Sequence, residues 1–208
     1  MAINHSMKKI LKALSFDGIE VEAARHLASL KAIDPMKIFH KTIDYKIYNG
    51  DYEVPVRIYL PREKVTEDLP VFLFFHGGGW VTDCIDNYER ICARLASATE
   101  HIVVSVEYRL APEHPFPTGF MDCYAVAKAI YTNRFILNVN PQRITLIGDS
   151  AGGNLAAAVS LKARDDGIFK PQRQILIYPA VNNDYSDTSR FQSVKDCGSD
   201  YLMTAGKM

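Results

Sequence analysis

The stretch "RITLIGDSAGGN", residues 143 to 154, decides the fold. An uninterrupted apolar segment runs into a glycine-rich turn, and an alanine-rich segment with a helical pattern follows. The turn fits the pattern G-x-S-x-G, in which a serine occupies a sharp bend between a strand and a helix. Gly148 and Gly152 meet the need for small residues two positions either side of the serine. Ser150 is therefore predicted to be a nucleophile at a helix N-terminus, which favours negative charge.

Four apolar runs of strand length predict a mostly parallel sheet that is buried on both faces. They lack the alternation of half-buried strands and occupy residues 71–75, 102–108, 143–148 and 174–180. Helical patterns separate them, at residues 87–98, 118–132 and 151–164. Because strands and helices alternate, the connections should be right-handed crossovers, and the predicted fold class is α/β with a doubly wound sheet.

Two segments with other patterns precede this sheet. Residues 7–33 carry apolar side chains at helical spacing, with a break near Asp17, which predicts two amphipathic helices. Residues 42–60 alternate apolar and polar side chains on either side of "NGD", which predicts an antiparallel hairpin with a tight turn. The sequence thus divides into an N-terminal helical segment, residues 1–41, and an α/β core, residues 42–208.

Composition narrows the class of protein. The 208 residues are 48% hydrophobic and 23% charged, as in ordinary globular proteins, and 24 basic residues balance 24 acidic ones. This balance disfavours nucleic acid as a partner. Four cysteines without a C-x-x-C pair suggest neither a metal site nor a disulfide framework. With no apolar run of membrane-spanning length and no signal peptide, we expect a cytoplasmic protein.

A second glycine cluster, "HGGGW" at residues 76–80, follows the first buried strand. Ligands bind beyond the carboxyl ends of parallel strands, so this cluster and the serine turn should meet at one edge of the sheet. Attack of a serine on an ester carbonyl creates an oxyanion that needs hydrogen-bond donors placed in advance. The backbone amides of Gly77, Gly78, Gly79 and Ala151 are the predicted donors. A phosphate-cradling loop is the weaker alternative, since neither G-K-[ST] nor G-x-G-x-x-G is present.

Several other residues have structural as well as functional interpretations. Asp149, beside the serine, is expected to brace the turn or neighbouring loops. Trp80 and Tyr185 are candidate walls of a substrate pocket, although each has the alternative of an ordinary core or surface aromatic. The remaining candidates can anchor a loop, pair with a helix dipole or line the mouth of the pocket: Arg109, Glu113, His114 and Asp122.

Three motifs taken together, "HGGGW", "YRLAPEHPFP" (residues 108–117) and "GDSAGGN", resemble the hormone-sensitive-lipase-like branch of the α/β-hydrolases. These carboxylesterases include acetyl esterases and arylacetamide-deacetylase-like enzymes. The resemblance runs from about residue 42 to the end, and the N-terminal segment is similar to the family's helical cap. It implies hydrolysis of short-chain or aryl esters through an acyl-enzyme on Ser150, with His76 as a structural residue. Neither a metal nor an organic cofactor is required, and a homo-oligomer is possible.

The resemblance also exposes a departure. In this fold the catalytic triad follows the chain order Ser, Asp or Glu, His, but no histidine follows His114 in this sequence. The resemblance therefore implies that the triad acid, the histidine and the last strands lie beyond residue 208, that the 208 residues alone are impaired, and that residues 174–180 form an exposed sheet edge. The alternative functions are a non-catalytic small-molecule-binding protein on the same fold, and an amidase or acyltransferase with the same nucleophile.

Overall fold

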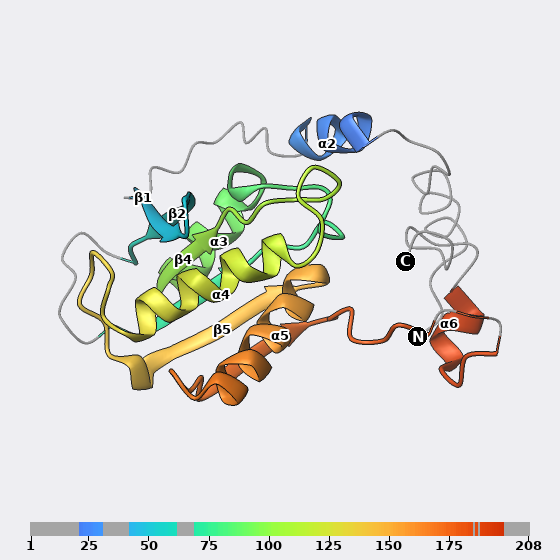
Figure 1. Cartoon of the computed structure of the whole chain (residues 1–208). Helices are drawn as coiled ribbons and strands as arrows, with labels where there is room; N and C mark the ends of the chain where they lie inside the picture. Colours follow the sequence, from blue (N-terminus) through green and yellow to red (C-terminus); the bar gives the residue numbers. More distant parts are fainter. Residues whose placement is uncertain (1–20, 31–41, 62–68, 185, 187, 198–208) are drawn as a thin grey trace. The chain divides into compact units, whose positions relative to one another are not determined.

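The computed structural model describes residues 21–30, 42–61, 69–184, 186 and 188–197. Val21–Ala180 form one compact unit, shown with its sheet and helices in Figure 1. The described residues from Val181 onward belong to a second unit, which holds the short helix α6 (Gln192–Cys197). The serine turn and the glycine cluster both lie in the first unit.

The first unit is built on a sheet of six strands in the order β1-β2-β4-β3-β5-β6. Strand β2 pairs antiparallel with β1 and β4, and all other neighbours are parallel. The strands are β1 (Thr42–Asn49), β2 (Tyr52–Tyr59), β3 (Val71–Phe75), β4 (Ile102–Val106), β5 (Ile144–Asp149) and β6 (Arg173–Ile177). The predicted fold class, a mostly parallel sheet with an N-terminal antiparallel hairpin, is confirmed.

Helices cover both faces of the sheet. They are α3 (Ile85–Thr99), α4 (Thr118–Tyr131) and α5 (Ala151–Asp166). A 3₁₀ turn, η1 (Pro141–Arg143), comes directly before β5. In β3, Leu73 and Phe75 belong to the buried cluster that includes α4 and α5, whereas Phe72 and Phe74 belong to the cluster that includes α3. Successive side chains of a strand point to opposite faces, so a strand covered on both sides is apolar throughout.

The N-terminal elements agree with the sequence where they are described. The second predicted helix is α2 (Val21–Leu30), and the first falls outside the described residues. In the hairpin, Asn49 pairs with Tyr52 across a two-residue turn. Gly50 has a φ of 62°, a conformation that glycine adopts without steric cost.

The strand at the other edge of the described sheet is β6. Its first three residues are exposed, and Ile175 has 41% of its surface accessible. Among the described residues, no helix is long and apolar enough to cross a membrane, and the described Cys84, Cys92 and Cys123 are free thiols.

A buried carboxylate ties the hairpin to the rest of the unit. The Asp122 side chain on α4 is fully buried and accepts a hydrogen bond of 2.7 Å from Asn49 Nδ2. It also accepts from the Arg109 backbone N–H (3.1 Å), Nε (2.8 Å) and Nη2 (2.7 Å). The Arg109 guanidinium lies 4.1 Å from the centre of the Tyr52 ring. Of the roles that the sequence leaves open for Asp122, these contacts favour the loop anchor.

We predict that Asp122→Ala lowers the free energy of unfolding by roughly 1.5–3 kcal/mol, because it removes hydrogen bonds to a buried charged group. Urea unfolding measures the change. The matched control is Asp165→Ala, which removes an exposed partner of Arg164 and should leave stability nearly unchanged. Equal losses in the two variants would contradict the anchoring role.

Candidate active site

Ser150 occupies a strained bend between β5 and α5. Its φ is 52° and its ψ is −117°, a conformation that costs a residue with a side chain roughly 1–3 kcal/mol. The backbone is held there from two sides: Ser150 N donates to Ile177 O (2.9 Å), and Ser150 O accepts from Ala180 N (3.2 Å) and Asn154 N (3.1 Å). The Ser150 side chain does not cap the helix that it begins. The geometry is that of the sharp strand-to-helix turn which the sequence predicts.

The serine turn packs directly against the chain that leaves β3. A Cβ atom added at Gly152, in the first turn of α5, would collide with the carbonyl oxygens of Phe75 and His76. One added at Gly148, near the end of β5, would lie 2.7 Å from Phe75 O and would also collide with the Gly152 backbone. Only small residues allow this approach, so the serine turn and the glycine cluster lie next to each other as expected.

The glycine loop orients its amides through its carbonyl groups. Gly78 has a φ of 106°, and its carbonyl accepts from Val81 N (3.1 Å) and Thr82 N (2.9 Å). The Gly77 carbonyl lies 2.8 Å from His76 Nδ1. In a trans peptide the C=O and the following N–H point in opposite directions. The Gly78 N–H therefore points away from the imidazole, and the Gly79 N–H points away from the Val81–Thr82 turn. No described residue accepts a hydrogen bond from either amide.

The Asp149 carboxylate joins three elements around the site. It is 8% exposed; its Oδ1 accepts from Gly77 N (3.0 Å) and its Oδ2 from Tyr88 Oη on α3 (2.8 Å). Gly77 N also donates to Tyr88 Oη at 3.1 Å. The Gly77 amide is thus engaged, unlike those of Gly78 and Gly79. Tyr88 is a site residue that the sequence reasoning missed, because one tyrosine in an amphipathic helix has the pattern of an ordinary core aromatic.

His76 is fully buried and supports the glycine loop through contacts with its neighbours. Its ring stacks on Tyr108 with 4.3 Å between centroids, and Tyr108 Oη donates to the His76 carbonyl at 2.8 Å. Burial lowers the pKa of the imidazole, so the ring is neutral near pH 7. With Nδ1 directed at the Gly77 carbonyl, Nε2 is buried and has no hydrogen-bond partner among the described residues.

The comparison with known proteins fits this geometry. A family model described as the alpha/beta hydrolase fold matches residues 72–208. The chain belongs to the α/β-hydrolases. Its six-stranded sheet, with the antiparallel strands at the N-terminal end and the serine turn after β5, is the described part of that fold.

Relatives of this chain include esterases. It is 40% identical to the carboxylesterase NlhH of Mycobacterium tuberculosis over 174 residues, which cover 82% of this chain and 53% of that protein. It is 37% identical to an arylesterase of Saccharolobus solfataricus, over 84% of this chain and 55% of that protein. The solved structure of a hyperthermophilic esterase from Pyrobaculum calidifontis matches with a TM-score of 0.82 and 34% identity, over 100% of this chain and 68% of that one.

These relatives confirm the resemblance to the hormone-sensitive-lipase-like branch. The hydrolase chain spans about half the length of the curated relatives that it matches.

A cavity of about 190 Å³ lies at the end of the glycine loop. Trp80, directly after the glycines, lines it, whereas Tyr185 falls outside the described residues. Its other walls come from the loop after β4, from α4 and from α5, and they include Ala111, His114, Phe116, Phe120 and Leu155. Three larger hollows, of about 720, 510 and 720 Å³, are lined neither by Trp80 nor by any residue of α5, the helix that follows Ser150. The small apolar cavity is therefore the candidate pocket.

We predict that Tyr88→Phe lowers the free energy of unfolding by about 1.5–3 kcal/mol, because it removes a hydrogen bond to a mostly buried carboxylate. It should also accelerate hydrogen exchange at the Gly77 amide, which then keeps only Asp149 as its acceptor. Urea unfolding and NMR-detected exchange measure the two effects.

Tyr124→Phe is the matched control for this variant. Tyr124 Oη donates to Asp166, a carboxylate that is about one-third exposed and also pairs with Lys162. The control should cost less stability and leave Gly77 exchange unchanged. A Tyr88→Phe protein whose Gly77 amide exchanges at the wild-type rate would contradict the bracing role.

Proposed function

We propose that the whole protein, of which these residues carry the serine turn and the glycine loop, hydrolyses carboxylic esters with short acyl or aryl groups. The observation that carries the proposal is the strained Ser150 backbone beside two unengaged glycine amides. The esterase relatives support the reaction class. A cavity of about 190 Å³ with aromatic walls fits a short chain or a single ring.

In the proposed reaction, Ser150 Oγ attacks the ester carbonyl carbon as its proton passes to a base. The carbonyl oxygen becomes an oxyanion, and the amides of Gly78, Gly79 and Ala151 donate hydrogen bonds to it. Ala151 is the first residue of α5, so its N–H has no partner within the helix. The intermediate then expels the alcohol, which takes up the proton, and leaves an ester on Ser150 that water cleaves. Gly77 is left out of this set because Asp149 engages its amide.

The base is left unassigned. No histidine follows His114 in the sequence, and His76 is fully buried with Nδ1 directed at a carbonyl. Asp149 is engaged by Gly77 and Tyr88, which supports bracing over proton transfer. The reaction as proposed uses a small-molecule ester and no cofactor, and we keep the cytoplasmic location as part of the proposal.

The proposal predicts that a fluorophosphonate probe phosphonylates Ser150, with fluoride as the leaving group, and that mass spectrometry finds the label on this residue. Because no described residue is assigned to take the proton, added imidazole should accelerate the labelling by serving as the base. Ser150→Ala should abolish it. Ser160→Ala is the matched control, since this serine lies on the same helix with its hydroxyl bonded to the Ala156 carbonyl.

Two results would contradict a serine hydrolase. One is the absence of label on Ser150 with and without imidazole; the other is labelling that survives in Ser150→Ala. An unlabelled protein that still binds small aryl esters would instead favour the alternative of a non-catalytic binding protein on the same fold.

A further inference from the structure

One arginine on α2 contacts both loops that border the candidate pocket. Arg25 Nε donates to the Val81 carbonyl (2.9 Å), and Nη2 donates to the Ala111 carbonyl (3.1 Å). Nη1 and Nη2 each donate to one oxygen of the Glu113 carboxylate, both at 2.8 Å. The planar guanidinium thus fills a bidentate carboxylate contact and two carbonyl contacts at once, which its fixed fork of donors allows.

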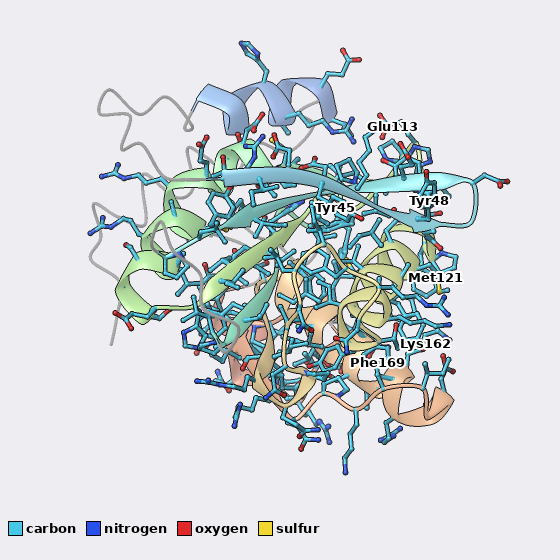
Figure 2. All side chains as sticks on the ribbon, turned by 90° about the vertical axis from the view of Figure 1, so that its left-hand side faces the viewer. Tyr45, Tyr48, Glu113, Met121, Lys162 and Phe169 are labelled. Atoms are coloured by element: carbon cyan, nitrogen blue, oxygen red, sulfur yellow. The ribbon has the colours of Figure 1, made fainter. Side chains whose placement is uncertain are left out.

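The acceptors of Arg25 lie on segments that wall the cavity. Val81 follows Trp80, and Ala111 N donates to the Trp80 carbonyl at 2.9 Å. Trp80, Ala111 and His114, the neighbour of Glu113, all line the cavity of about 190 Å³. Figure 2 shows Glu113 beside α2. The end of the glycine loop and the proline-rich loop after β4 are therefore linked to each other and to the same side chain.

The contact is better suited to positioning than to global stability. The Arg25 and Glu113 side chains are 30% and 54% exposed, and exposed ion pairs contribute little to unfolding free energy. The Val81 and Ala111 carbonyls lie in irregular segments, where side chains supply the partners that helices and strands would otherwise provide. The hydrogen bond from Arg25 lowers the pKa of Glu113 to about 2, so the carboxylate stays ionised above moderately acidic pH.

We propose that Arg25 is a positioning residue that sets the size selectivity of the site: it fastens α2 to the two loops and holds Trp80 and Ala111 where they confine the pocket. This inference rests on the proposed function, because selectivity has meaning only for a serine that reacts. Without Arg25, the loops should spread, and large acyl or alkyl groups should gain access relative to small ones.

The experiment compares the 208-residue chain with Arg25→Ala and Arg25→Lys. Rates of Ser150 labelling are measured in imidazole with an ethyl and a dodecyl fluorophosphonate, and hydrogen exchange is followed at the Ala111 amide. In Arg25→Ala the ratio of ethyl to dodecyl labelling should fall by about tenfold, the size of a modest change in pocket fit. Ala111 exchange should accelerate while the urea midpoint barely moves. Arg25→Lys should resemble Arg25→Ala, since one ammonium cannot reach all three acceptors.

Two further variants complete the comparison: one is a control, and the other separates the geometry of the guanidinium from its charge. Arg164→Ala removes an exposed arginine that pairs with Asp165, and it should change neither the labelling ratio nor Ala111 exchange. The exchanged pair Arg25→Glu with Glu113→Arg restores opposite charges but sets a carboxylate against the Val81 and Ala111 carbonyls. It should behave like Arg25→Ala. Full recovery in the exchanged pair would overturn the proposal, because the ion pair alone would then suffice.

The readouts distinguish this inference from the proposed function. If hydrogen exchange at the Ala111 amide is unchanged in Arg25→Ala, Arg25 does not hold the two loops together, whatever the labelling shows. Faster exchange with an unchanged labelling ratio overturns the selectivity role. If Ser150 of the unmodified chain takes no label, the proposed function fails and the selectivity role fails with it. The hydrogen-exchange comparison still tests whether Arg25 fastens α2 to the two loops.

Discussion

The close approach of α5 to the chain leaving β3 is the constraint on which the site depends. Gly152 faces the Phe75 and His76 carbonyls with no room for a side chain. Because β3 and β5 are parallel neighbours, their carboxyl ends already lie side by side. The absence of a Cβ then brings the helix N-terminus into contact with the glycine loop. Two motifs that are about 70 residues apart in the sequence thereby lie next to each other, and amides from both can face the same oxygen.

The strain at Ser150 is tolerated because neighbouring backbone groups fix it. Ile177 and Ala180, at and after the end of β6, each share a hydrogen bond with the Ser150 backbone. A strained φ and ψ persist only where the surroundings determine them. Strand β6 therefore matters to the site through its backbone. The exposed residues lie at the start of this five-residue strand, and the residue that bonds to the Ser150 backbone lies at its end.

The sequence predicted what local constraints dictate. Strand β3 could be predicted because both of its faces are covered, which makes the segment apolar throughout. The turn at Ser150 could be predicted because a sharp bend requires small neighbouring residues. The sequence could not indicate that Asp149 engages the Gly77 amide, since the amide's direction depends on the loop conformation. Tyr88 and Arg25 were missed for a related reason. Their partners lie 61 and up to 88 residues away, and a tyrosine or an arginine in an amphipathic helix carries no sign of such a contact.

Two arginine–carboxylate pairs show how burial assigns different roles to the same chemistry. Asp122 is fully buried and accepts hydrogen bonds from the hairpin and from the loop after β4, so its loss removes several hydrogen bonds to one buried charge. Glu113 is more than half exposed, and water can replace Arg25 at little cost. What water cannot replace is the direction in which Arg25 holds the Val81 and Ala111 carbonyls. The first pair therefore stabilises the fold, and the second determines the shape of a pocket.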